Sequence, residues 1–141
     1  MRRVRLIART ASAAALAVSI VACGGSPAGP SAPLTGQWGG DHVSLTLTDA
    51  GGGAEFDCAH GTIAGAVTAD AAHEFRVSGT FVREHGGPIA IGETPDVHPA
   101  VYSGSATDGT MQLTVTLTDS NAVVGTFTLV RSAPGRVVKC L

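Results

Sequence analysis

Hydrophobic and polar residues alternate with a period of two along most of the chain beyond its first forty residues. Hydrophobic residues occupy every second position in 43–47 and in 111–117, with serine, threonine or glutamine between them. Shorter rows of the same kind occur at 55–58, 75–81 and 126–129. Because successive side chains of a β-strand point to opposite faces, this alternation predicts strands with one buried face and one solvated face.

Turn-forming residues separate these rows, at 50–53, 107–109, 119–121 and 134–135. Short connections between strands of this length are typical of an antiparallel meander. The clearest strands are expected at 101–106, 110–119, 123–131 and 136–141, and no helical period follows the first 22 residues. A flat sheet would leave hydrogen-bonding edges exposed. The pattern therefore predicts an all-β domain, a small antiparallel meander barrel or a two-sheet sandwich of about 7–8 strands.

The first 22 residues differ in composition from the rest of the chain. Four arginines, at positions 2, 3, 5 and 9, precede a stretch of small apolar residues that ends at Ala22. The uninterrupted apolar part, 11–22, is shorter than the roughly 20 residues that a transmembrane helix needs. Basic residues followed by a short apolar stretch predict a cleaved signal peptide over residues 1–22.

A single cysteine follows this stretch directly. The residues Ile20-Val21-Ala22-Cys23, with glycine next, resemble the lipobox of bacterial lipoproteins. The resemblance implies cleavage before Cys23 and acylation of its new N-terminus, which makes Cys23 the lipidation site and the membrane a partner. Several acyl chains hold a protein stably where one holds it only marginally. The alternative is a signal peptide cut elsewhere, with Cys23 left as a spare thiol.

The residues after Cys23 predict a tether and then a single domain. Residues 23–35 are the lipidated cysteine and a linker of Gly, Pro, Ser and Ala, which buries nothing. Residues 36–141 are enough for one domain with a modest core. The expected location is the cell envelope, lipid-anchored at the outer membrane or the cell surface and facing an oxidising compartment.

Removal of the signal peptide makes the chain acidic. Four of its nine Lys and Arg residues lie before Cys23, which leaves five against eleven Asp and Glu, a net charge of −6 with neutral histidines. A nucleic acid partner requires clustered Lys and Arg. The composition therefore argues against binding to nucleic acid and to anionic lipid.

The start of the domain carries a second resemblance. Gly36-Gln37-Trp38 resembles the G-x-W motif in the first strand of lipocalin and avidin-like barrels. That resemblance implies a tryptophan that closes one end of a barrel, with a late basic residue, Arg131 or Lys139, packed on its ring by a cation–π contact. The segments WGGDH, EFDCAHG, REHGGP, HPAVYSG and the terminal KCL also look like a group of short bacterial lipoproteins with no assigned function, and that resemblance implies no activity.

Two further cysteines remain in the domain, Cys58 on an early expected strand and Cys140 on the last. An even number of cysteines in an exported domain suggests a disulfide. A Cys58–Cys140 bond would hold the last strand beside an early one, as closure of a barrel requires. The alternatives are two free thiols or a metal-bound thiolate.

Metal and catalytic sites are only weakly indicated. Cys58 and His60 would share one face of a strand, and His42, His85 and His98 come from separate segments. The spacings of known zinc sites are absent from the sequence, so we expect no metal and no cofactor. The serines lack the context of a nucleophile elbow, so the sequence predicts no catalytic residues and no enzyme activity.

Residues 84–100 form the segment that a purely structural role explains least well. It is long, rich in Gly and Pro and without periodicity, and such loops are often functional. The candidate binding residues are His85, Ile89, Ile91, Glu93, Asp96 and His98. One interpretation is a cap on one end of the barrel with the isoleucines turned inward. The other is a lid or a partner-binding edge.

These features favour a membrane-anchored envelope lipoprotein with a non-enzymatic β-barrel that binds a protein partner or a small apolar ligand. An inhibitor of an exported hydrolase, a lysozyme or a peptidase, is the alternative, and a metal-dependent enzyme is a third and less favoured hypothesis. An open cavity lined by Leu45, Phe56, Val77, Leu113 and Phe127 would indicate a ligand, whereas a packed interior would indicate a protein that acts through its surface.

Overall fold

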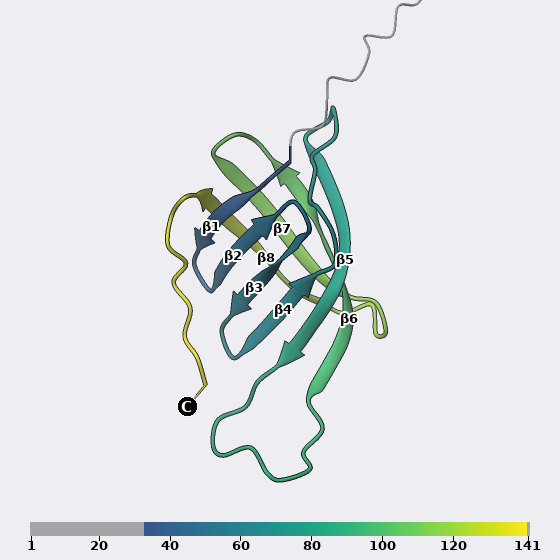
Figure 1. Cartoon of the computed structure of the whole chain (residues 1–141), viewed down its shortest axis with the longest axis vertical. Coiled ribbons are helices and arrows are strands. Elements are labelled where there is room, and N and C mark those ends of the chain that lie inside the picture. The colour runs from purple at the N-terminus through teal and green to yellow at the C-terminus, as the bar shows by residue number, and fades with distance from the viewer. Residues whose placement is uncertain (1–32, 141) are drawn as a thin grey trace, which may run out of the picture.

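A computed structural model describes residues 33–140, which form a closed barrel of eight antiparallel strands (Figure 1). The strands are β1 (Gly36–Gly40), β2 (Val43–Thr48), β3 (Gly51–Phe56), β4 (Ala59–Ile63), β5 (Glu74–Arg83), β6 (Asp96–Ala106), β7 (Thr110–Leu117) and β8 (Val123–Arg131). Each strand pairs with the next along the chain, and β8 pairs with β1 to close the barrel. The all-β meander is confirmed, with eight strands and as a barrel rather than a sandwich.

The period of two in the sequence places the core. In β7, Met111, Leu113, Val115 and Leu117 are at most 1% exposed, while the threonines between them face outward. The other strands contribute inward rows in the same way, including Val43, Leu45 and Leu47 from β2. Burial of each such side chain stabilises the fold by about 1.5–3 kcal/mol. The described residues 33–140 include no helix long and apolar enough to cross a membrane.

The connections between strands lie at two opposite ends of the barrel (Figure 1). The upper pole holds the start of β1, the turn at 49–50, the loop at 64–73 and the turn at 107–109. The lower pole holds the turns at 41–42, 57–58 and 118–122 and the long loop between β5 and β6, residues 84–95, which we call the β5–β6 loop. Pro33 and Leu34, at the end of the predicted tether, already pack at the upper pole, since Leu34 is 5% exposed and its amide donates to Val67 O at 2.8 Å.

Trp38 and Arg131 meet beneath the upper pole. Trp38 is fully buried, and its Nε1 donates to Leu34 O at 3.2 Å. The guanidinium carbon of Arg131 lies 4.4 Å from the centre of the indole ring, and its nitrogens donate to Asp108 O at 2.9 Å and Thr35 O at 2.8 Å. Of the two basic residues expected on the ring, Arg131 takes this place, whereas Lys139 lies at the other pole.

The predicted last strand at 136–141 is wrong for the residues described. Residues 132–140 instead form an extended C-terminal tail that crosses the outside of the barrel toward the lower pole (Figure 1). Its ladder contact is a single parallel bridge between Arg136 and Asp41. The tail lies so close to β1 that a Cβ on Gly39 would come within 2.4 Å of Ala133 O, so glycine is required there.

Two further strand boundaries differ from the prediction. Asp57 and Cys58 form the turn between β3 and β4, with Cys58 at φ 50°, so Cys58 and His60 do not share a strand. The glycines at 51–53 belong to β3 rather than to the turn before it. Two of them lie where the sheet is crowded: a Cβ on Gly51 would lie 2.3 Å from Ile63 O, and one on Gly52 would lie 2.2 Å from Thr46 O.

Candidate functional site

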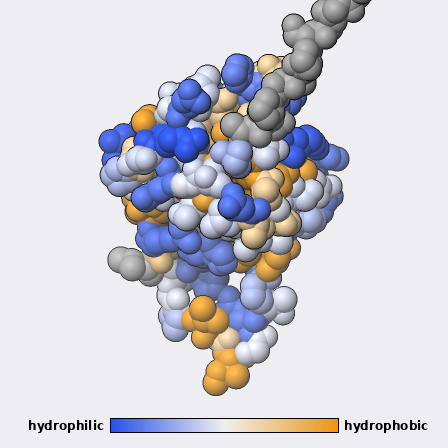
Figure 2. All heavy atoms as spheres, turned by 45° about the horizontal axis from the view of Figure 1, so that its top comes forward, coloured by the Kyte–Doolittle hydropathy of each residue, from blue (hydrophilic) through white to orange (hydrophobic). Residues whose placement is uncertain are grey.

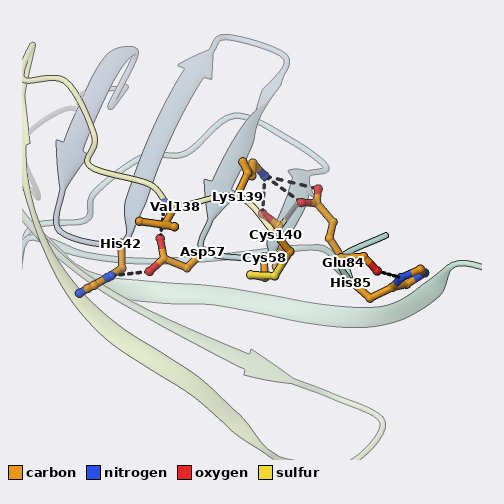
Figure 3. Close-up of a disulfide and its surroundings, with 10 residues drawn as sticks. His42, Asp57, Cys58, Glu84, His85, Val138, Lys139 and Cys140 are labelled. Carbon is orange, nitrogen blue, oxygen red and sulfur yellow. Dashed lines mark hydrogen bonds and ion pairs between the residues drawn. A yellow bond between two sulfur atoms is a disulfide. The ribbon is translucent and has the colours of Figure 1, made fainter. Parts of the chain in front are cut away.

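Cys58 and Cys140 form a disulfide at the lower pole, with their Cα atoms 4.9 Å apart (Figure 3). The bond joins the turn after β3 to the end of the C-terminal tail. Because both sulfurs are bonded to each other, neither is a free thiol or a thiolate ligand. The sequence prediction of this pair is therefore confirmed, although the partner of the turn is a tail and not a strand.

The tail is also hydrogen-bonded across the lower pole. The Val138 amide donates to Asp57 Oδ1 at 2.7 Å, and the Cys58 amide donates to Val138 O at 3.2 Å. His42 Nδ1 lies 2.5 Å from Asp57 Oδ2. The Val138 amide first, and then His42, hold the pKa of Asp57 below its ordinary value because both interactions favour the carboxylate. These contacts fix the end of the tail against the turns of β1–β2 and β3–β4.

Glu84 connects this disulfide region to the β5–β6 loop. Its amide donates to Cys58 O at 2.8 Å. Its carboxylate lies 2.6 Å from His60 Nδ1 and 3.2 Å from Lys139 Nζ. Figure 3 shows the contact with Lys139. The hydrogen bond to His60 lowers the pKa of Glu84 most, with a further contribution from Lys139. The first residue of the loop is thus held by the same tail that the disulfide fastens.

The rest of the loop is braced from within. His85 Nε2 forms an ion pair with Glu93 Oε1, and the Ala90 amide donates to Glu93 Oε2 at 2.9 Å. The Glu93 amide in turn donates to Ala90 O at 3.1 Å. The Gly86 carbonyl and then Glu93 raise the pKa of His85, since both stabilise the protonated ring. Two side chains eight positions apart therefore join the two legs of the loop.

The loop projects from the barrel and exposes its two isoleucines. Ile89 is 81% exposed and Ile91 fully exposed, so the interpretation that they turn inward to cap the barrel is wrong. Figure 1 shows that the loop extends beyond the lower ends of β5 and β6. Figure 2 shows hydrophobic residues at the far end of this projection. A barrel whose lower end is already filled has no space for them.

Aromatic rings fill that end. The ring of Phe56 lies 5.4 Å from those of both Phe81 and Phe127, centre to centre, in tilted arrangements. Leu45 and Leu113 behind them are at most 1% exposed. The residues predicted to line an open cavity are thus packed on one another or on the core.

The described residues carry hollows on their surface that are lined by other residues than that set. One, of about 410 Å³, lies at the upper pole beside Leu34 and Arg131. Another, also of about 410 Å³, lies on the outer face of β5, β6 and β7. The third, of about 480 Å³, lies beneath the β5–β6 loop and is lined by Ile89 and Cys140 among others. The hollow closest to the candidate residues therefore lies between the loop and the barrel, with the end of the tail beside it.

Asp96 and His98, the remaining candidate residues, lie on β6 and not on the projecting part of the loop. His98 Nδ1 is 2.7 Å from Asp119 Oδ2, and this hydrogen bond raises the pKa of His98 and lowers that of Asp119. The buried Nε2 of the same ring makes no hydrogen bond, although Asp96 Oδ1 is 2.9 Å away. This cluster ties β6 to the β7–β8 turn and is separate from the loop tip.

Four histidines at the lower pole each pair with a different carboxylate. The pairs are His42–Asp57, His60–Glu84, His85–Glu93 and His98–Asp119. Across residues 33–140 no group of three or more Asp, Glu, His or Cys side chains is arranged to hold a metal ion. Each pair joins two positions at least eight residues apart in the chain, so the histidines connect turns, loop legs and strand ends at this pole. The sequence did not predict these pairings, because the partners are up to 24 positions apart.

Comparison of the chain with protein-family models, with curated proteins and with solved structures finds no match. The fold and site define an architecture: a packed, eight-stranded antiparallel barrel with a braced loop at one pole. The predicted signal peptide over residues 1–22 and the predicted lipidation site Cys23 lie outside the described residues.

Proposed function

We propose that this chain is a lipid-anchored lipoprotein of the bacterial cell envelope, without enzyme activity, that binds a protein partner through its β5–β6 loop. The observation that carries the partner-binding part is the exposure of Ile89 and Ile91 at the end of a braced loop. The lipobox resemblance at Cys23 carries the anchoring part.

The energetics favour a protein partner over a small apolar ligand. Burial of two isoleucine side chains in a partner contributes on the order of 1.5–3 kcal/mol each. The bracing of the loop by His85 and Glu93 lowers the conformational entropy lost on binding. A small ligand would instead need an open interior, and the rings of Phe56, Phe81 and Phe127 occupy the lower end.

The position of the loop is compatible with the anchor. The described chain begins at Pro33 at the upper pole, and the β5–β6 loop lies at the lower pole (Figure 1). An acylated Cys23 would hold the molecule through the upper pole and leave the loop free to meet proteins away from the membrane surface.

The partner is tested by capture from intact envelope. The acylated protein is cross-linked in cells and purified in detergent beside the double variant Ile89→Asp/Ile91→Asp and the control Val130→Asp. Val130 is a matched control because it is 51% exposed and lies on β8, away from the loop. We expect one protein in stoichiometric amount with wild type and Val130→Asp and its loss with the double variant. Equal recovery by all three would contradict the proposal.

The anchor is tested separately. Mass spectrometry of the mature N-terminal peptide should find acyl chains on Cys23, and Cys23→Ser should move the protein from the detergent phase to the aqueous phase. An unmodified cysteine in the native protein would refute lipid anchoring and leave the role of the loop untouched.

A further inference from the structure

We infer that the β5–β6 loop occupies the substrate cleft of an exported endopeptidase that prefers aliphatic side chains, with Ile89 in the principal side-chain pocket, and thereby inhibits it. This inference rests on the proposed function, because it names the class of partner. It selects the peptidase from the two hydrolases that the sequence suggested, since a cleft for sugars offers no pocket for an isoleucine.

The tip of the loop has main-chain hydrogen-bonding groups that a peptide-binding cleft could use. Residues 88–90 have no regular secondary structure and precede a turn at 91–92. Among residues 33–140, the backbone N–H and C=O of Ile89 make no hydrogen bond, so both are available to a partner. Clefts that recognise extended peptides bind the main chain by such hydrogen bonds and select side chains with pockets.

Two glycines flank the part of the loop that carries Ile89. Gly87 has φ 91° and Gly92 has φ 84°, backbone conformations that other residues rarely adopt. They turn the chain on either side of the tip, and Ile89 between them is 81% exposed. The tip can therefore enter a cleft while the barrel stays outside it.

The internal brace explains why such a loop would inhibit the enzyme rather than serve as a substrate. The His85–Glu93 pair joins the two legs on either side of the Ile89–Ala90 bond. Hydrolysis of that bond would consume one water and leave a carboxylate on Ile89 and an amine on Ala90. Both new ends would stay attached to the braced legs, so the cut loop would leave the cleft slowly.

Further contacts at the base of the loop hold its two legs together. Arg83 and Asp96 are opposite each other in the β5–β6 ladder, and the Glu84 amide is bonded to Cys58 O. The disulfide then fixes Cys58 to the tail. Because these contacts fix both ends of the loop to the barrel, the loop is constrained before binding, which lowers the entropic cost of association.

The experiment measures inhibition by the full acylated protein in detergent. The probes are pancreatic elastase and subtilisin, which accept aliphatic or large apolar residues, with trypsin and lysozyme as enzymes of other specificity. We expect reversible inhibition of elastase or subtilisin and none of trypsin or lysozyme. Ile89→Asp should weaken inhibition at least 100-fold, and Val130→Asp should leave it unchanged.

A change of specificity provides the sharpest variant. Ile89→Arg should lose inhibition of the aliphatic-specific enzyme and gain inhibition of trypsin, because the pocket residue alone is altered. His85→Ala should keep initial binding but be cleaved at the tip faster, as intact-mass spectrometry would show, because the brace across the cut is lost. Thermal unfolding of each variant within a few degrees of wild type verifies the fold.

Three results would overturn the inference: no inhibition of either aliphatic-specific enzyme, inhibition that survives Ile89→Asp, or rapid cleavage of the wild-type loop with release of active enzyme. Inhibition of lysozyme alone would also overturn it. None of these would affect loop-dependent capture of a different protein from the envelope, so the proposed function stands or falls on its own experiment.

Discussion

Removal of the disulfide should destabilise the domain more than any exposed substitution. Cys58 and Cys140 are 82 positions apart. In the chain-entropy treatment a closed loop of that length reduces the entropy of the unfolded chain by about 15 cal/mol/K, which corresponds to about 4.5 kcal/mol at 25 °C. At roughly 4–5 °C for each kcal/mol in a domain of about 100 residues, the melting temperature should fall by about 20 °C.

The double variant Cys58→Ser/Cys140→Ser avoids an unpaired thiol. Its thermal unfolding, followed by circular dichroism, is compared with wild type and with Val138→Ser, an exposed change on the same tail that keeps the disulfide. Surface changes of that kind usually alter stability by no more than about 0.5 kcal/mol. A melting temperature of the double variant within 5 °C of wild type would refute the reasoning that the bond acts on the unfolded chain.

Hydrogen exchange locates the effect. Without the disulfide, the amides of Val138 and Cys58, which bond tail and turn to each other, should lose protection first. The Glu84 amide should follow, because its acceptor is Cys58 O. Protection that remains equal at all three amides would show that the tail is held without the bond, and that the loop base does not depend on it.

Three other outcomes are expected. Arg131→Met should lower the free energy of unfolding in urea by about 1–3 kcal/mol, from the cation–π contact and two hydrogen bonds; no change would show that the contact is solvent-screened. Gly39→Ala should displace the tail and destabilise by about 1–3 kcal/mol, whereas Gly53→Ala, whose Cβ would meet nothing nearer than 3.9 Å, should not, and equal melting temperatures would contradict this. The stability difference between wild type and His98→Gln should be largest between the ordinary pKa values of Asp119 and His98, 3.8 and 6.5; it should fall as pH rises through the raised pKa of His98 and as pH drops through the lowered pKa of Asp119. A difference that is flat from pH 4 to 9 would refute that pairing.

Strand positions were predicted well wherever the alternation was strong. The rows at 43–47 and 111–117 became β2 and β7 because each alternating apolar set has one face to bury. The alternation at 55–58 predicted a strand that includes Asp57 and Cys58, but these two residues form a turn. Cys58 adopts φ 50°, a backbone angle that the alternation of hydrophobicity does not encode. Residues 136–140 were misjudged for a related reason, because an extended tail and a strand can share one hydrophobic pattern.

The candidate site was predicted only in part. The sequence identified the length of the segment at 84–100 and its isoleucines, but the direction in which Ile89 points depends on whether the barrel has space to receive it. The packing of Phe56 with Phe81 and Phe127 removes that space. Similarly, no local signal in the sequence pairs His85 with Glu93, since the loop must fold before the two legs meet.

The sequence by itself determined the all-β class, the meander order and the pair of cysteines, because these follow from local periodicity, turn residues and counts. The basic residue on Trp38 was expected, as one of two candidates, from the resemblance of Gly36-Gln37-Trp38 to the G-x-W motif. Only the tertiary structure decided that β1 pairs with β8, that the tail is bonded to the turns of the lower pole and that the isoleucines face solvent. Those features arise from contacts between segments far apart in the chain, where the filling of shared space, rather than the preference of any one segment, selects the arrangement.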